Sequence, residues 1–87
     1  MKHDPTRASY GVVAEYPDYD HSYDRRIEKA ARRSMGGCGF CFSDGYRDVS
    51  FTFRSKEAAN AAAKRIREMR PKKRGTRVKV YFYKAEA

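Results

Sequence analysis

The sequence predicts a two-layer α+β sandwich, in which one four-stranded antiparallel sheet has two helices on one face. Three observations lead to this fold class. Apolar and polar residues alternate over 38–54 and again over 76–84, as in strands that bury one face. Two further segments, at about 23–35 and between 55 and 71, repeat apolar residues at helical spacing. The length of 87 residues leaves room for one domain.

The N-terminal part predicts a strand followed by a helix. Residues 1–8 are polar and are expected to form a flexible N-terminus. Residues 9–16 are rich in β-forming side chains and precede Pro17, which suits a first strand. Asp20 or Ser22 is expected to cap a helix over about 23–35, which Gly36 and Gly37 end. One apolar stripe is expected to bury this helix: Tyr23, Ile27, Ala30, Ala31 and Met35.

A hairpin is predicted over residues 38–54. Asp44 and Gly45 favour a two-residue type I′ turn, which would place Ser43 opposite Tyr46 and Cys38 opposite Phe51. Paired residues share a sheet face. The predicted buried side therefore holds the apolar residues Cys38, Phe40, Phe42, Val49, Phe51 and Phe53. The opposite side holds Gly39, Cys41, Ser43, Asp48, Ser50, Thr52 and Arg54.

The C-terminal part predicts a second helix and a last strand. Ser55 is a good N-cap, Pro71 stops the helix, and Gly75 turns the chain into the strand 76–84. The stripe that this helix is expected to bury is Ala59, Ala62, Ala63, Ile66 and Met69. The order β-α-β-β-α-β predicts a ferredoxin-like domain over 9–84, followed by a flexible C-terminus at 85–87.

The stretch "DGYRDVSFTFRSKEAANAAAKRI" resembles the third strand and second helix of RNA-recognition-motif (RRM) domains, most specifically over residues 46–66. That family stacks RNA bases on aromatic side chains of its two central strands. With Phe51 and Phe53 in the core, the stacking positions fall on Asp48 and Ser50, and on Val13 or Tyr10 in the first strand. The resemblance therefore implies the fold, and we do not transfer the family's base contacts to this chain.

Positive charge is concentrated near the C-terminal end. Residues 64–79 hold nine Lys or Arg and one Glu, which is +8 of the formal +9 of the chain. A cluster of like charges favours an anionic partner, although a solvated helix end would also explain it. The candidate residues for binding nucleic acid or another partner are the basic residues of this run, a nearby Arg and two tyrosines: Arg54, Arg70, Lys72, Lys73, Arg74, Arg77, Lys79, Tyr81 and Tyr83.

Two functions from different classes remain open at this point. The first is a small basic module that contacts nucleic acid through the run at 64–79 and an aromatic and basic sheet face. The second is a stand-alone inhibitor, of the kind that phages encode and similar to anti-CRISPR proteins, which docks on an acidic surface of a nucleic-acid-processing complex. No long apolar segment indicates a membrane span or a signal peptide, so we expect a cytoplasmic protein.

The pair Cys38 and Cys41 forms a C-x-x-C motif that suits zinc or redox chemistry in other contexts. Here the motif lies at the start of a predicted strand, and zinc needs further ligands, so a structural role is favoured over metal or redox chemistry. No triad, carboxylate pair or glycine-rich phosphate loop is evident. We therefore expect no enzyme activity, cofactor or metal.

Overall fold

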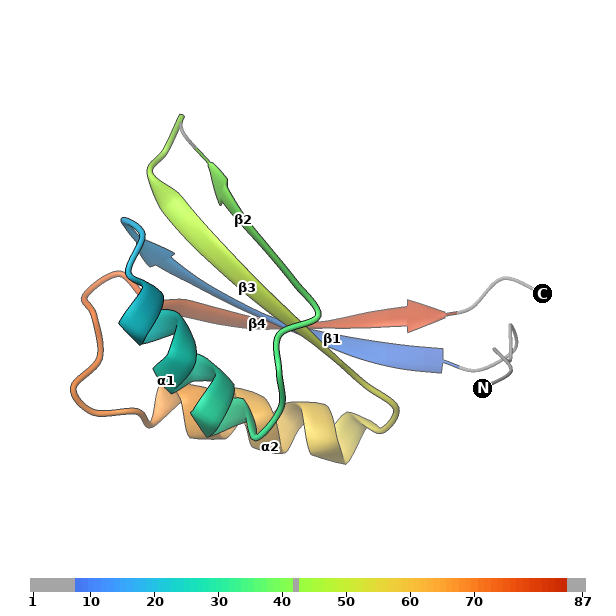
Figure 1. The fold of residues 1–87 in the computed structure, drawn as a ribbon. Coiled ribbons are helices and arrows are strands. Elements are labelled where there is room, and N and C mark those ends of the chain that lie inside the picture. Colours follow the sequence, from blue (N-terminus) through green and yellow to red (C-terminus); the bar gives the residue numbers. More distant parts are fainter. Residues whose placement is uncertain (1–7, 42, 85–87) are drawn as a thin grey trace.

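The computed structural model describes residues 8–41 and 43–84. Its elements follow the predicted order (Figure 1). They are β1 (Ala8–Pro17), α1 (His21–Ala31), β2 (Gly37–Cys41), β3 (Tyr46–Phe53), α2 (Lys56–Arg67) and β4 (Arg77–Lys84). The flexible ends expected at 1–8 and 85–87 lie outside the described residues, apart from Ala8, which begins β1.

The four strands form one antiparallel sheet in the order β2-β3-β1-β4. Both helices cover the same face of this sheet, as Figure 1 shows. The predicted two-layer, ferredoxin-like α+β arrangement is therefore confirmed. β1 occupies the centre, where Val12 pairs with Phe51 on one side and with Val80 on the other.

The core fills the space between the sheet and the helices. β1 and β3 each contribute alternate residues, and the buried residues Val49, Phe51 and Phe53 confirm the predicted face of β3. Both helices bury most of the predicted stripes, with Ile27 and Ile66 fully enclosed, while Ala30, Met35 and Met69 are only partly buried. Burying a side chain of this size stabilises the fold by about 1.5–3 kcal/mol. The small side chains of Ala59, Ala62 and Ala63 are also fully buried, so α2 packs closely on the sheet.

The helix starts follow the prediction, whereas the end of α1 does not. Asp20 Oδ1 accepts hydrogen bonds from the backbone N–H groups of Ser22 and Tyr23, at 3.0 and 3.2 Å. Ser55 caps α2 in the same way. The predicted end of α1 at Gly36 and Gly37 is wrong, because Arg32 already adopts a left-handed conformation, with φ of 59°.

A long-range contact accounts for the early end of α1. Arg65 of α2 donates hydrogen bonds to the carbonyls of Ala30 and Ala31, at 2.7 and 3.1 Å. The last carbonyls of a helix need partners from outside the helix, and Arg65 supplies them for α1. Met35 therefore lies beyond the helix, although it still packs against the core.

The hairpin register differs from the prediction by two residues. Cys41 pairs with Tyr46, and Cys38 pairs with Val49 in place of Phe51. A type I′ turn requires positive φ at both central residues, but of the pair Asp44-Gly45 only Gly45, with φ of 72°, has it. The connection is longer: Gly45 N–H bonds to the Cys41 carbonyl at 2.8 Å, and Asp44 Oδ1 accepts from Tyr46 N–H.

A shift by two residues keeps each side chain on its predicted face, but the predicted burial of β2 is partly wrong. Cys38 is exposed and Phe40 is only half-buried. β2 is an edge strand, and its side chains are covered less completely than those of the inner strand β3. Phe42, also predicted to be buried, lies outside the described residues.

Candidate functional site

The structure divides the nine candidate residues between two surfaces. Arg77, Lys79 and Tyr81 lie on the open face of the sheet, which is the face without helices, and exposed Arg54 directly follows β3. The side chain of Tyr83, which follows on β4, lies outside the described residues. The other four candidates lie between α2 and β4, and we call this segment the basic loop: Arg70, Lys72, Lys73 and Arg74.

The basic loop is bound to the start of α1. Tyr23 Oη accepts a hydrogen bond from Lys73 N–H at 3.1 Å and contacts Thr76 Oγ1 at 2.8 Å. Arg26 donates to the carbonyl of Pro71, and Lys73 Nζ lies 3.3 Å from Asp20 Oδ2. A shallow pocket of about 240 Å³ lies between the two segments, and Arg26, Lys72 and Lys73 line it together with Asp20, Ser22, Tyr23 and Pro71.

The basic loop joins a larger positive surface. α1 and the residue pair that follows it carry Arg25, Arg26, Lys29, Arg32 and Arg33, which the sequence had indicated only as a solvent-facing side. Residues 25–34 hold five Lys or Arg and one Glu, and residues 56–74 hold eight Lys or Arg and two Glu. These two segments therefore carry +10, against +9 for the whole chain. We call the surface that they form the basic helical face.

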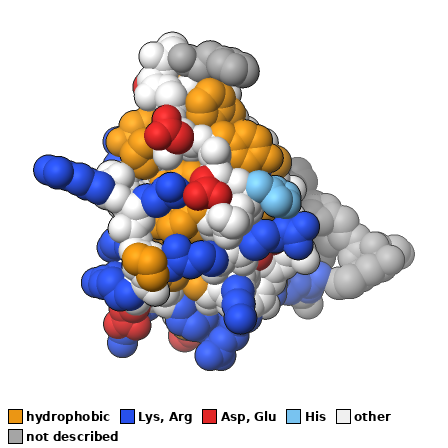
Figure 2. Space-filling model, turned by 60° about the vertical axis from the view of Figure 1, so that its left-hand side comes forward, with side chains coloured by type: hydrophobic (Ala, Val, Ile, Leu, Met, Phe, Trp, Pro, Cys, Tyr) orange, Lys and Arg blue, Asp and Glu red, His pale blue; other side chains and the backbone are white. Residues whose placement is uncertain are grey.

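Figure 2 looks at the end of the molecule where α1 begins and the basic loop lies. Lys and Arg side chains dominate the lower half of this view, with few acidic groups among them. Helix packing produces this surface, because each helix turns its apolar stripe to the sheet and its charged side to solvent. The amphipathic pattern of residues 23–35 already indicated a basic solvent-facing side, but the prediction of a binding surface used only the charges of residues 64–79.

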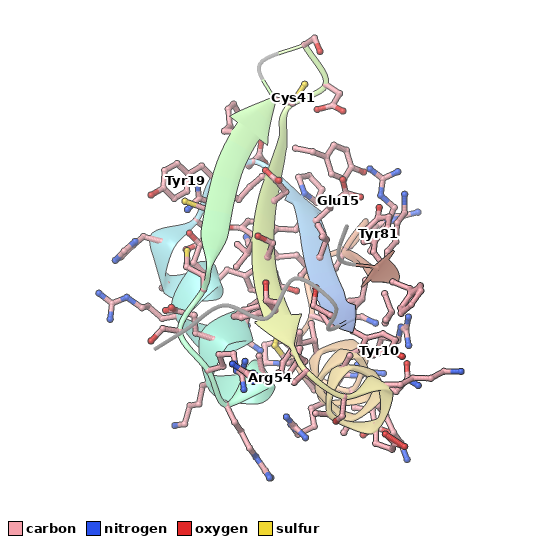
Figure 3. The ribbon with its side chains drawn as sticks, turned by 90° about the vertical axis from the view of Figure 1, so that its right-hand side faces the viewer. Tyr10, Glu15, Tyr19, Cys41, Arg54 and Tyr81 are labelled. Carbon is pink, nitrogen blue, oxygen red and sulfur yellow. The ribbon has the colours of Figure 1, made fainter. Side chains whose placement is uncertain are left out.

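The open face of the sheet is close to neutral. Glu15 and Asp48 are cross-strand neighbours on β1 and β3, and Arg77 is the neighbour of Glu15 on β4. Arg77 Nε lies 3.4 Å from Glu15 Oε1, and its guanidinium lies 4.4 Å from the centre of the Tyr46 ring. Figure 3 shows Glu15 and Tyr81 on this side. Asp48 and Ser50 lie on the face opposite the buried Phe51 and Phe53, as predicted.

A buried polar network connects β1, α1 and β3. The guanidinium of Arg47 donates to Asp24 Oδ2 through Nη2 at 2.7 Å and through Nε at 3.1 Å. Tyr16 donates its hydroxyl to Asp24 Oδ1, and the ring of Tyr19 lies over the Arg47 guanidinium at 4.3 Å. Asp24 and Arg47 are both buried, which was not predicted from the sequence. The predicted pairing of Ser43 with Tyr46 implies that Arg47 pairs with Phe42 and shares its face, and that was the available signal.

The surroundings of this network raise the pKa of both Tyr16 and Arg47. Burial, followed by the hydrogen bond to Asp24, raises the pKa of the Tyr16 phenol well above its ordinary range. The hydrogen bond to Asp24 raises the pKa of the Arg47 guanidinium. The neutral phenol of Tyr16 and the cationic guanidinium of Arg47 both bind the enclosed carboxylate of Asp24, so the network connects α1 to the sheet. None of the three groups is an activated nucleophile.

The two cysteines are free and exposed, and the intervening spacing puts them on opposite faces of β2. Cys41 Sγ lies 3.0 Å from Ser43 Oγ. Within residues 8–41 and 43–84, no group of three or more His, Cys, Asp or Glu side chains is placed to hold a metal ion. Within the same residues, no helix is long and apolar enough to cross a membrane.

Comparisons of the chain with protein-family models, with curated proteins and with solved structures gave no match. The fold and the charged surface alone define the class of this protein, which is a small ferredoxin-like α+β domain with a strongly basic helical layer.

Proposed function

We propose that this protein is a non-enzymatic, cytoplasmic binding module that contacts the phosphate backbone of a nucleic acid through its basic helical face. The observation that carries the proposal is the distribution of charge. Residues 25–34 and 56–74 carry +10, and the rest of the chain carries −1. A surface with this excess repels itself, and a polyanion relieves that repulsion while it releases its own counterions.

The geometry supports contact with phosphates more than with bases. The basic helical face presents flexible Lys and Arg side chains from two helices and one loop, which suit a row of phosphates. On the open face, the RRM-like stacking positions hold Asp48 and Ser50, and neither can stack on a base. The RRM resemblance supports the fold in this proposal, whereas binding is assigned to the opposite side of the molecule.

Some cations on this face are already engaged, and this limits how many can reach a phosphate. Arg65 is bonded to α1 carbonyls, and Lys73 lies beside Asp20. Lys72 Nζ donates to the carbonyl of Arg67 at 3.0 Å, a hydrogen bond at the surface that a phosphate could replace. Arg74, also in the basic loop, is exposed. Lys72 and Arg74 are therefore the best positions at which to test the proposal.

The test is an anisotropy titration of labelled single-stranded and duplex oligonucleotides at two salt concentrations. The double change Lys72→Gln, Arg74→Gln is expected to weaken binding to all sequences alike. It should also reduce the log–log salt slope by about 0.7–0.9 for each phosphate that is no longer neutralised. The matched control removes two exposed charges elsewhere, by Arg54→Gln and Lys79→Gln, and should change binding little.

Two results would contradict the proposal. If the unmodified protein shows no salt-dependent binding even at low ionic strength, nucleic acid is not the partner. If the two double variants lose affinity equally, the interface is not on the basic helical face. In that case the open face, with Lys79 and Tyr81, would have to be considered again.

A second function is favoured by a separate observation, the exposed aromatic side chains next to cations. The side chains of Tyr19 and Phe82 are each 58% exposed, and Tyr19 packs on Arg47. Aromatic and Arg side chains are common anchors of protein interfaces. An inhibitor of the phage type, docking on an acidic surface of a nucleic-acid-processing complex, would use them. Its signature is a stoichiometric protein partner that remains bound after nuclease treatment.

A further inference from the structure

The two edges of the sheet differ in how they are protected against pairing with another strand. The β4 edge carries Arg77 and Lys79, and Arg67 donates a hydrogen bond to the backbone carbonyl of Val78 at 3.0 Å. The β2 edge, in contrast, consists of Gly37, Cys38, Gly39, Phe40 and Cys41. It contains no charged residue and no proline, which are two of the devices that commonly protect an edge strand.

The β2 edge is open to a further strand. In the described part of the chain, β2 has β3 on one side and no strand on the other. It lies at the margin of the sheet, and Tyr19, from the loop before α1, lies beside its outer side (Figure 3), so a neighbouring strand would pack against Tyr19 on the helix side. Adding a strand at such an edge provides main-chain hydrogen bonds to a new partner.

We propose that the strand that completes this edge is β2 of a second copy of the same chain. Antiparallel pairing about a two-fold axis at Gly39 would place Gly37 of one copy opposite Cys41 of the other, and Cys38 opposite Phe40. The result is a continuous eight-stranded sheet with all four helices on one face. This inference goes beyond the proposed function and does not depend on it.

The distribution of charge around this edge is compatible with a second copy as its occupant. Two chains of +9 repel each other wherever their cationic surfaces meet, and β2 is an element without charge. Antiparallel pairing also reverses one strand relative to the other. The hairpin turn of one copy, with exposed Asp44, then lies beside the start of β2 in the other copy, which follows Arg32 and Arg33. Exposed Arg32 of each copy would then lie at the same end of the paired strands as Asp44 of the other copy, whereas Arg33 is bonded to the carbonyl of Thr52.

Side-chain packing supports the same arrangement. On the helix side of β2, Cys38 is exposed and Phe40 is half-buried. Phe40 is the cross-strand neighbour of Arg47, on which the exposed Tyr19 ring packs (Figure 3 shows Tyr19 beside β2). Cross-strand contact between Cys38 and Phe40 of the two copies would cover both. On the opposite side, Gly37 and Gly39 have no side chains to obstruct the pairing.

The first experiment measures the mass of the nuclease-treated, full-length protein by sedimentation equilibrium over a wide range of concentrations. We expect the mass to rise from 10.1 kDa to twice that value as the concentration increases. Added salt should favour the dimer, because it screens the repulsion between two chains of +9. Nucleic-acid binding responds to salt in the opposite direction, so failure of one proposal is distinguishable from failure of the other.

The second experiment places a charge in the paired strands. Cys38→Lys is expected to leave the protein monomeric, because it brings two ammonium groups together near the two-fold axis. Asn60→Lys adds the same charge at an exposed position on α2 and should leave the dimer intact. Circular dichroism melting should show both variants folded, since both positions are exposed.

A cross-linking readout needs no disruptive variant. With Cys41→Ser, Cys38 is the sole thiol of the chain. The two Cys38 residues are diagonal neighbours in the proposed register, at about 7–8 Å, so a short bis-maleimide should join two copies. A monomeric mass at all concentrations overturns the proposal and leaves the edge to an extended segment of another protein. A Cys38→Lys variant that still forms the dimer, or a dimer that the reagent does not join, also overturns it.

Discussion

Two carboxylate–cation pairs at the start of α1 differ in length and in exposure to solvent. Asp24 lies one turn after Asp20, and each carboxylate contacts a cation from a distant part of the chain. The Asp24–Arg47 pair is 2.7 Å long, with side chains 1% and 9% exposed. The Asp20–Lys73 pair is 3.3 Å long, with side chains 37% and 38% exposed.

This difference separates a pair that holds the fold together from a pair that adds little to its stability. A buried charge pair has lost its water, so breaking it leaves an uncompensated charge inside the protein. An exposed pair exchanges its partner for water at little cost, and salt screens it. Arg47 therefore fixes α1 to the sheet, whereas the contact of Lys73 with Asp20 contributes little to the stability of the fold. The predictions below test this division, from the largest expected effect to the smallest.

The largest effect is expected for Arg47→Met. The substitution leaves Asp24 buried without its cation, and we expect a loss of about 3–5 kcal/mol in the free energy of unfolding, measured by urea titration. The double variant Arg47→Met, Asp24→Leu is the matched control. It removes both charges and should recover most of the loss. A loss below about 1 kcal/mol for the single variant would mean that Asp24 reaches water.

A smaller loss is expected for Tyr16→Phe. The hydroxyl donates to Asp24, lies 2.9 Å from the carbonyl of Asp20 and accepts from Asp20 N–H at 3.2 Å. Its removal leaves polar atoms without that partner, while the ring still packs against Tyr23 at 4.6 Å. We expect a loss of about 1–3 kcal/mol in urea titration. An unchanged stability would show that the hydroxyl is dispensable and that Arg47 alone satisfies Asp24.

The same phenol gives a prediction about alkaline pH. The pKa of Tyr16 is raised above its ordinary value of 10.0 by burial and by Asp24, so the folded state holds this proton more tightly than the unfolded chain. The stabilisation is complete below pH 10 and is lost progressively as the pH rises above it. An ultraviolet titration should therefore show one phenol that ionises late, and Tyr16→Phe should remove it. Ionisation of every tyrosine near pH 10 would contradict the buried position of the hydroxyl.

The smallest effect is expected for Lys73→Gln. Three contacts lower the pKa of Asp20 from the ordinary 3.8 to about 2. The largest effect comes from the hydrogen bond with the Ser22 hydroxyl, the next from Tyr23 N–H, and the third from Lys73. Asp20 therefore contributes stability above about pH 3.8 and loses it as the pH falls through about 2. Without Lys73, the pKa followed by carboxyl NMR should rise only part of the way to 3.8. A rise to the full ordinary value would show that Lys73 dominates.

Local patterns predicted most of the fold because they are set by neighbouring residues. The caps Asp20 and Ser55, most of the buried stripe of each helix and the faces of β3 depend on short-range spacing, and the structure confirms them. The end of α1 depends on Arg65, more than thirty residues later in the chain, and was predicted at the wrong place. The hairpin register failed for a local reason, since Asp44 does not adopt the positive φ that the assumed turn requires.

The candidate site was harder to predict because it depends on how the layers assemble. A count of charges over 64–79 located the excess along the chain, but it could not show that β4 turns Arg77 and Lys79 to the open face. It also could not show that the solvent side of α1 joins the basic loop through Arg26. The burial of Arg47 was unexpected for a similar reason: a lone Arg in a strand has no visible partner until α1 brings Asp24 to it.

The central position of β1 has a consequence for the order in which the chain folds. Val12 must find Phe51 on one side and Val80 on the other, and the second partner is much more distant along the chain. Closing the longer loop costs more entropy, so docking of β4 is expected to be the late step. Until it occurs, the backbone of β1 is unpaired on that side and can be captured by another chain. Folding yield should therefore fall at high protein concentration, and preformed β1–β3 pairing alone would not prevent it.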